Sequence, residues 1–194
     1  MAMRQYAVFD RPMTQTQSEV AAAVGGMAFR RPQLADGQSV HALVSRCPPL
    51  DLNSSYSYFL LCSHHAETCV VVQQGAEMVG FLSAYRLPQA PQTLFVWQVA
   101  VDAKVRGRGL AGRMLAELLA RPSCAGVHFI ETTVSPSNHA SRQVFSRFAA
   151  RHHAAWQEDV FLAREHFGAE AHEEEVLLRI GPLSIQGNDP EACT

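Results

Sequence analysis

The segment RGRGLAGRML (Arg106–Leu115) decides the fold of this 194-residue chain. Gly107, Gly109 and Gly112 have the spacing G-x-G-x-x-G of a dinucleotide-binding turn, and Glu131 lies near the position of that motif's ribose-binding acid. A dinucleotide-binding fold places this turn directly after its first strand and needs several further strand–helix units. Here about half of the chain precedes the glycines and too few residues follow Glu131, so the sequence disfavours that fold. No Lys-Ser/Thr pair follows the glycines, which argues against a P-loop.

The same segment suits an anion at the start of a helix. Gly107 and Gly109 carry no side chain that would keep a ligand away from the backbone. Free N–H groups and the helix dipole favour negative charge there, and Arg106 and Arg108 add positive charge. A pyrophosphate fits this description. A strand–helix connection that needs glycine only for its turn, with the arginines in solvent, fits this segment equally well.

Composition and charge narrow the class of protein. Hydrophobic residues make up 47% and charged residues 18%, as in ordinary globular domains, and the net charge of −2 offers no basic surface for nucleic acid or an acidic membrane. The five cysteines include no C-x-x-C pair, so we expect neither a zinc ribbon nor a disulfide framework, and a cytoplasmic location. The apolar run VAAAVGGMAF is too short to span a bilayer and lacks a preceding basic region.

The pattern of apolar residues predicts a mixed α/β fold. Residues 1–25 lack periodicity, and we expect them to form a disordered or loosely attached leader before a single domain over 26–194. Asp36 is expected to cap the first helix and Ser135 the last one. Strands are expected over 27–32, 68–74, 77–85, 93–101, 126–134 and 174–183, with a further strand around 154–162, and helices over 37–47, 56–65, 109–122 and 135–152.

Two segments carry a family resemblance. WQVAVDAKVRGRGLAGRML (Trp97–Leu115) resembles the acetyl-CoA-binding segment of the GCN5-related N-acetyltransferase (GNAT) superfamily, whose pattern Arg/Gln-x-x-Gly-x-Gly/Ala is matched by Arg106, Gly109 and Ala111. SPSNHASRQVF (Ser135–Phe145) resembles the second cofactor segment of that superfamily. Across residues 29–183 the chain resembles the branch of the superfamily that acetylates the side-chain amine of L-2,4-diaminobutyrate in ectoine biosynthesis.

The resemblance implies an acetyltransferase with the GNAT fold, a mixed central sheet of about six to seven strands flanked by about four helices. It implies acetyl-CoA as co-substrate, L-2,4-diaminobutyrate as acceptor and a homodimer. The strand holding Val99 and Val101 would offer main-chain N–H groups to the pantetheine and the thioester. The remaining cofactor residues would be Arg106, Gly107, Arg108, Gly109, Ala111 and Gly112 at the pyrophosphate, with Asn138 and Ser141 at the pantetheine or phosphate arm. Many relatives have a proton-donating Tyr where this chain has Phe145, so no tyrosine acid is assigned.

The acceptor brings two cationic amines and one carboxylate, so its site needs acidic and amide groups. The expected catalytic residues are Glu131, which would bind or deprotonate an amine, Asp51, and Trp97, whose ring would face an ammonium group. Asn53, Thr132 and His172 complete the expected substrate site. Several of these have a plain structural alternative: a helix cap for Asp51, core packing for Trp97, and an exposed strand end for Glu131. Thr132 and its neighbour Thr133 could both bind the substrate, but threonine is also common in strands.

The nine histidines show no metal-ligand spacing, and acetyl transfer needs no metal, so none is expected. Two other functions stay open from the sequence. One is a sibling acetyltransferase for another small amine, and the other is a non-catalytic CoA-binding module, which Phe145 would suit.

Overall fold

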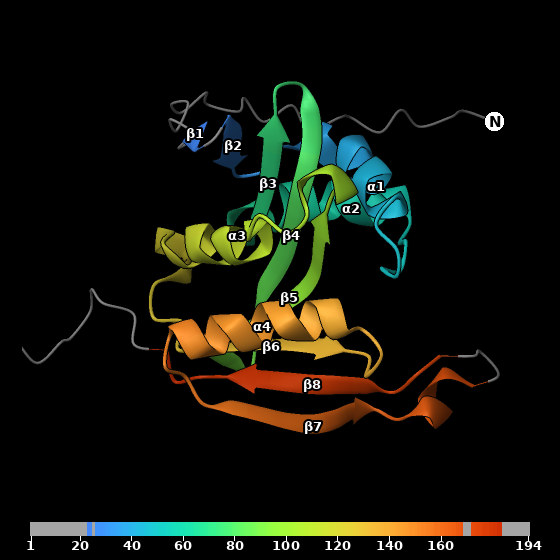
Figure 1. Ribbon diagram of the computed structural model, residues 1–194, viewed down its shortest axis with the longest axis vertical. Helices are drawn as coiled ribbons and strands as arrows, with labels where there is room; N and C mark the ends of the chain where they lie inside the picture. Colours follow the sequence, from blue (N-terminus) through green and yellow to red (C-terminus); the bar gives the residue numbers. More distant parts are fainter. Residues whose placement is uncertain (1–22, 25, 169–171, 184–194) are drawn as a thin grey trace, which may run out of the picture.

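The computed structural model describes residues 23–24, 26–168 and 172–183 (Figure 1). The strands are β1 (Ala23–Val24), β2 (Met27–Arg30), β3 (Cys69–Gln74), β4 (Glu77–Leu87), β5 (Ala90–Val101), β6 (Phe129–Val134), β7 (Trp156–Leu162) and β8 (Glu175–Ile180). The α-helices are α1 (Gly37–Ser45), α2 (Ser55–Ser63), α3 (Leu110–Leu119) and α4 (His139–Arg151). Short 3-10 turns are η1 (Leu34–Asp36), η2 (Ala66–Thr68), η3 (Ala103–Val105), η4 (Pro122–Cys124) and η5 (Arg164–Phe167).

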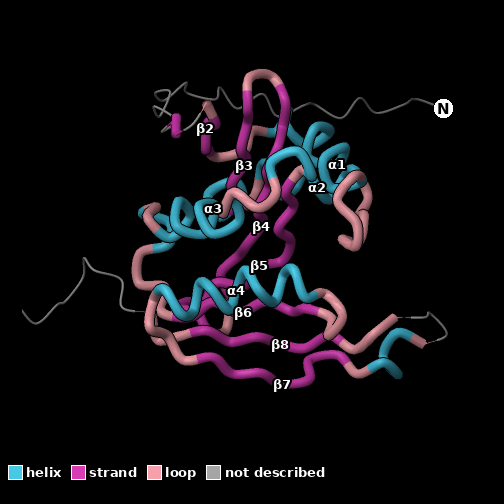
Figure 2. The backbone as a smooth tube through the Cα atoms, in the orientation of Figure 1, coloured by secondary structure: helices cyan, strands magenta, loops and turns pink. Residues whose placement is uncertain are grey.

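The described strands form one mixed sheet in the order β1-β2-β3-β4-β5-β6-β8-β7. Only β5 and β6 pair in parallel, and every other neighbouring pair is antiparallel. The predicted mixed α/β fold with four flanking helices is confirmed. The further strand expected around residues 154–162 is β7, and the two-residue β1 extends the sheet at its other edge. In Figures 1 and 2, β3–β5 run steeply across the direction of β6, β7 and β8.

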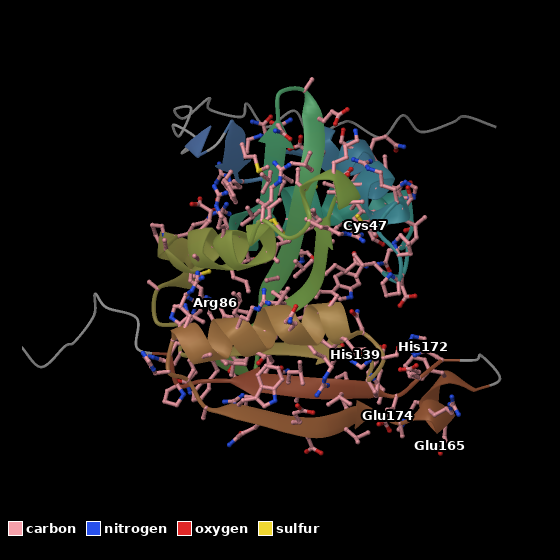
Figure 3. All side chains as sticks on the ribbon, in the orientation of Figure 1. Cys47, Arg86, His139, Glu165, His172 and Glu174 are labelled. Atoms are coloured by element: carbon pink, nitrogen blue, oxygen red, sulfur yellow. The ribbon has the colours of Figure 1, made fainter. Side chains whose placement is uncertain are left out.

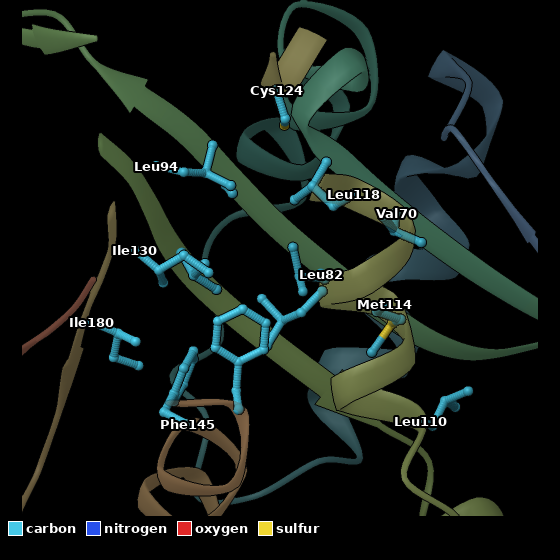
Figure 4. Packing of buried hydrophobic residues seen from close by; sticks show 14 of the residues in the cluster. Val70, Leu82, Leu94, Leu110, Met114, Leu118, Cys124, Ile130, Phe145 and Ile180 are labelled. Carbon is cyan, nitrogen blue, oxygen red and sulfur yellow. The ribbon is translucent and has the colours of Figure 1, made fainter. Parts of the chain in front are cut away.

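Helices cover the sheet on two sides because its strands alternate apolar residues between the faces. On β3, Val70 and Val72 belong to the core under α3 and α4, whereas Val71 belongs to a second core with α1 and α2. Figure 4 shows the first core, with Leu118 of α3 among fully buried neighbours from β4, β5 and β6.

Close packing of α3 on the sheet fixes where its first turn lies. A Cβ atom on Gly80 of β4 would stand 3.1 Å from Val72 Cβ and 3.2 Å from Met114 Sδ, so a larger residue would fit only if these side chains moved by a few tenths of an ångström. Met114, Leu115 and Leu118 of α3 are fully buried, in keeping with their helical spacing. The glycine turn before α3 is therefore held against the carboxyl end of β5.

Of the two predicted helix caps, the position of Asp36 is confirmed and Ser135 is wrong. Asp36 is the N-cap residue of α1, as predicted, but its side chain makes no capping bond, because the carboxylate accepts two hydrogen bonds from Arg30, at 2.7 and 2.8 Å, and one from the Gln33 N–H. Ser135 precedes a turn, because the Asn138 N–H donates to its carbonyl, and α4 begins only after Asn138. The Ser135 hydroxyl donates instead to Glu175 Oε1 at 2.9 Å.

Most of the predicted leader lies outside the part of the chain that the structure describes. Residues 1–22 and 25 of the expected leader lie outside the described residues. Ala23–Val24 pair with β2, so the expected boundary at residue 25 runs through this short hairpin. Within the described ranges, none of the helices is long and apolar enough to cross a membrane, and His, Cys, Asp and Glu side chains nowhere gather in threes as they would around a metal ion.

Candidate functional site

A β-bulge at Trp97 sets the geometry of β5. Gln98 pairs with Ser83 of β4 and Val96 pairs with Ala84, so Trp97 is an extra residue between them. The bulge shifts the alternation of side chains. Leu94 and Val96 face α3 and α4 before it, and Val99 and Val101 pack against the same core after it.

Strands β5 and β6 separate just before this bulge. β5 and β6 pair at three positions, Thr93 with Phe129, Leu94 with Ile130 and Phe95 with Glu131. β6 then continues beside β8 to Val134, while β5 continues beside β4 to Val101. In the described part of the chain no strand pairs with β5 on the β6 side after Phe95. Backbone groups on that side of β5 are therefore available to a ligand.

A pocket of about 560 Å³ lies at this opening. Its walls come from the loop after α1 (Cys47–Leu50), from Val99 and Val101 of β5, from the glycine turn and α3, and from α4. Cys47 donates from its Sγ to the Val101 carbonyl at 3.4 Å, which holds the loop against β5 (Figure 3).

The glycine turn meets the requirements of an anion site. Gly107 and Gly109 have φ of +77° and +70°, a conformation that other residues adopt at a cost. A Cβ on Gly107, Gly109 or Gly112 would meet no protein atom within 4 Å, so all three face open space. The N-terminal N–H groups of α3 lie at the same turn. This geometry fits a pyrophosphate and supports the anion-binding interpretation of the segment.

Arg106 and Asp102 hold the connection between β5 and this turn. Arg106 Nε donates to the Val101 carbonyl at 3.0 Å. The buried Asp102 carboxylate accepts from the Lys104 N–H at 3.0 Å and from Arg46 Nε at 2.7 Å, and these bonds keep the pKa of Asp102 below its usual value. Asp102 was not predicted, although an Asp two residues before an N–H it caps is a local signal that could have found it.

Asn138 and Ser141 meet at the start of α4. Asn138 Oδ1 accepts from the Ser141 N–H at 3.1 Å, so the asparagine is the N-cap. Both residues line the pocket, as do all the predicted cofactor residues except Arg108. Phe145 also lines it and is buried, and no tyrosine stands among the described lining residues.

The predicted acceptor residues do not line this pocket, and three of them, Glu131, Asp51 and His172, fall into two groups. In the first group, Glu131 is buried on β6 and its Oε1 accepts a hydrogen bond from Arg179 of β8. The Arg179 guanidinium lies 4.0 Å from the centre of the Phe129 ring, which fixes its direction. Glu131 is therefore no exposed strand end. Arg179 was missed because nothing near it in sequence marks a partner on another strand.

Thr132 faces away from this group. Ile130 and Val134 point into the core under α4, and strand alternation puts Thr132 on their face. Thr133 shares the face of Glu131 instead. The structure thus separates Thr132 from the carboxylate that it was expected to accompany.

The second group joins the loop after α1 to the segment before β8. Asp51 Oδ2 lies 3.9 Å from His172 Nε2, and His172 Nδ1 lies 2.6 Å from the Glu173 carbonyl oxygen. The hydrogen bond to Glu173 raises the pKa of His172, and the negative charge of Asp51 adds to this effect. His172 also stacks on Phe167, with ring centres 4.0 Å apart. In Figure 3 it lies just before the start of β8.

A buried polar relay fixes the Asp51 loop on β5. Gln98 Nε2 donates to the Asp51 carbonyl at 2.8 Å, and the hydroxyl of the fully buried Tyr58 donates to Gln98 Oε1 at 3.3 Å. The Asn53 N–H donates to the same Tyr58 hydroxyl. Trp97, next to Gln98, is 42% exposed, which excludes the core alternative for its ring. Asp51 caps no helix, because the N-cap of α2 is Ser54.

Comparison with known proteins identifies the family. The sequence profile of the Acetyltransferase (GNAT) family matches residues 38–150. This chain belongs to the GNAT acetyltransferase family. The matched residues include the glycine turn, β5 and most of α4.

Individual relatives of this GNAT chain agree with one another. It is 51% identical over 157 residues to the L-2,4-diaminobutyric acid acetyltransferase of Bordetella parapertussis, which covers 80% of this chain and 84% of the relative. It is 46% identical over 170 residues to the enzyme of the same name from Streptomyces avermitilis, covering 87% of this chain and 95% of the relative. The solved diaminobutyrate acetyltransferase EctA of Paenibacillus lautus, in complex with its substrate L-2,4-diaminobutyric acid and coenzyme A, aligns with a TM-score of 0.79 at 43% identity, over 84% of this chain and 97% of that one.

Proposed function

We propose that this chain transfers the acetyl group of acetyl-CoA to the side-chain N4 amine of L-2,4-diaminobutyrate. The products are N4-acetyl-L-2,4-diaminobutyrate and CoA, as in ectoine biosynthesis. The observation that carries this proposal is the opening of the sheet after Phe95 and Glu131, with a glycine-turn pocket on one side and a buried carboxylate on the other. The substrate for which the relatives are named supplies the identity of the acceptor.

On the cofactor side, the chain binds and orients a thioester. The N–H groups of the glycine turn and of α3 bind the pyrophosphate, and Val99 and Val101 give the pantetheine an apolar strand wall. Backbone N–H groups of β5 beyond the bulge donate to the carbonyl oxygen on which negative charge develops. Acetyl-CoA supplies the activated acetyl group. Arg108 does not line the pocket, and it contributes positive charge near the turn.

On the acceptor side, the reacting amine must lose a proton before it attacks, because it is mostly protonated near neutral pH. Glu131 accepts that proton, and Arg179 fixes the direction of its carboxylate. Asp51 and the exposed ring of Trp97 bind ammonium, and Asn53 and His172 complete the site around the other end of the substrate. Thr133 takes the place expected for Thr132, because it shares the face of Glu131.

The departing sulfur receives no proton from the position where many relatives have tyrosine. Phe145 has none to give, and the described pocket residues include no tyrosine. The thiolate of CoA is therefore protonated by water or leaves as an anion near the start of α3.

We further propose that the chain acts as a homodimer in the cytoplasm. Val160 and Phe161 on the edge strand β7 are 53% and 54% exposed, and a second copy of the chain would cover them. The four described cysteines are buried free thiols, in keeping with a reducing compartment. Light scattering of the purified protein measures the oligomeric state directly.

Release of free CoA thiol from acetyl-CoA tests the activity. The assay compares L-2,4-diaminobutyrate with ornithine, lysine, putrescine and spermidine, and mass spectrometry locates the acetylated nitrogen. We expect a strong preference for diaminobutyrate and modification of N4. Preference for another amine would leave a GNAT enzyme with a different acceptor, and CoA binding without turnover would indicate a binding module.

A further inference from the structure

The cofactor pocket continues past the glycine turn to a cationic end. It runs along α4 from Asn138 to Arg151 and His152, with Ala116 of α3 on the opposite wall. α4 has 13 residues, so at 1.5 Å per residue these two ends lie about 20 Å apart. The glycine turn lines only part of this pocket. Binding of an anion at the turn does not explain why arginines line the pocket at the far end of α4.

Arg147 and Arg151 are spaced by one helical turn and lie on the same face of α4. Like charges in this arrangement repel each other. Within the described part of the chain neither guanidinium forms an ion pair, whereas Arg142 on the same helix binds Glu158 at 2.7 Å. The described residues that line the pocket include no carboxylate. This end of the pocket therefore carries positive charge that no acidic side chain neutralises.

The proposed cofactor has an anionic group that matches it. CoA carries two separate anionic groups, the pyrophosphate and a monophosphate on the 3′ position of its ribose. The backbone N–H groups of the glycine turn suit the first group. A guanidinium, with its planar fork of donors, suits the second one. We propose that Arg147 and Arg151 bind the 3′-phosphate and make this chain selective for CoA over 3′-dephospho-CoA, an inference that rests on the proposed cofactor.

Arg147 is stronger evidence for a bound phosphate than Arg151. Arg151 is the last residue of α4, where the helix dipole favours a cation whatever the ligand. Arg147 lies one turn earlier and gains less from the dipole. The decisive substitution is therefore Arg147→Ala, with Arg151→Ala as the second variant. Arg142→Ala is the matched control, since it removes an arginine of the same helix that Glu158 already holds.

The experiment measures kcat/KM with acetyl-CoA and with acetyl-3′-dephospho-CoA, at fixed diaminobutyrate and ionic strength. We expect the unmodified protein and Arg142→Ala to prefer acetyl-CoA by about tenfold or more, as one charged hydrogen-bonding partner would give. Arg147→Ala should lose most of this preference through a lower value with acetyl-CoA, while its value with the dephospho compound stays within about twofold.

Equal use of both cofactors by the unmodified protein would overturn the inference, as would an undiminished preference in Arg147→Ala. Titration calorimetry measures the same preference without turnover, as the ratio of the dissociation constants of CoA and 3′-dephospho-CoA. If neither thioester is turned over, the proposed acetyl transfer fails, and the ratio of the two dissociation constants still decides whether Arg147 recognises the 3′-phosphate.

Discussion

Replacing Gly112 by alanine should make the protein more stable and a weaker binder of its cofactor. Gly112 is the third residue of α3 and its φ is not positive, so alanine fits the backbone. Alanine in a helix is more favourable than glycine by about 0.5–1 kcal/mol. For a domain of this size, the melting temperature should rise by roughly 1–4 °C.

The effect on the cofactor has the opposite sign. The space beside Gly112 is empty of protein atoms within 4 Å, and on the proposed function the phosphate arm of CoA occupies it. A methyl group there should push the arm away and remove one charge-assisted hydrogen bond, worth about 1.5–3 kcal/mol. That loss corresponds to a roughly 10- to 150-fold higher dissociation constant for CoA.

Calorimetry measures both quantities on the same samples, with melting recorded in the absence of cofactor. Gly75→Ala is the control, because Gly75 has a φ of +61° in the β3–β4 hairpin, away from the pocket. It should lower the melting temperature and leave CoA affinity unchanged. An unchanged dissociation constant in Gly112→Ala would refute the assignment of this space to the cofactor, and a lower melting temperature would refute the helix argument.

Three other substitutions test the core, the acceptor side and the pH dependence. Leu118→Ala should cost about 2–5 kcal/mol in urea unfolding, because Leu118 of α3 is fully buried against the sheet; a loss below 1 kcal/mol would contradict this packing. Glu131→Gln should lower kcat by about a hundredfold or more and change the KM for acetyl-CoA little, as steady-state kinetics will show; equal activity removes Glu131 from the reaction. The raised pKa of His172 means that its protonated form stabilises the fold fully below about pH 6.5 and that this contribution disappears as the pH rises through the raised value. His172→Gln should therefore be destabilising in urea unfolding at pH 5.5 and neutral at pH 9, and a loss that is equal at both pH values would contradict the charge argument.

Local sequence patterns predicted most of the helices and strands, although not β1, and the family resemblance assigned the glycine turn to the cofactor. The glycine spacing, the Asn after a strand and the spacing of Leu110, Met114 and Leu118 are all contained within one or two elements. They predict the side of the molecule on which the pocket lies, and the pocket there is lined by almost every residue expected at the cofactor.

Details that depend on pairing between distant strands were not predictable in this way. One example is the threonine that lies on the same face of β6 as Glu131. Thr132 and Thr133 both suit a strand, and the answer depends on which face of β6 packs against α4. The ion pair of Glu131 with Arg179 joins residues 48 positions apart. Asp36 and Ser135 both have good capping side chains, but partners elsewhere, Arg30 and Glu175, take their oxygen atoms.

The continuity of the sheet rests on a narrow seam. Three residue pairs join strands β1–β5 to strands β6–β8. Beyond Phe95, the edge of β5 that faces β6 has no strand beside it in the described chain, whereas β4 still pairs with the other edge. An extended molecule with amide groups, seated along that edge, would act as a short replacement strand. On the proposed function the pantetheine arm is such a molecule, so binding it completes the sheet and fastens the two halves together.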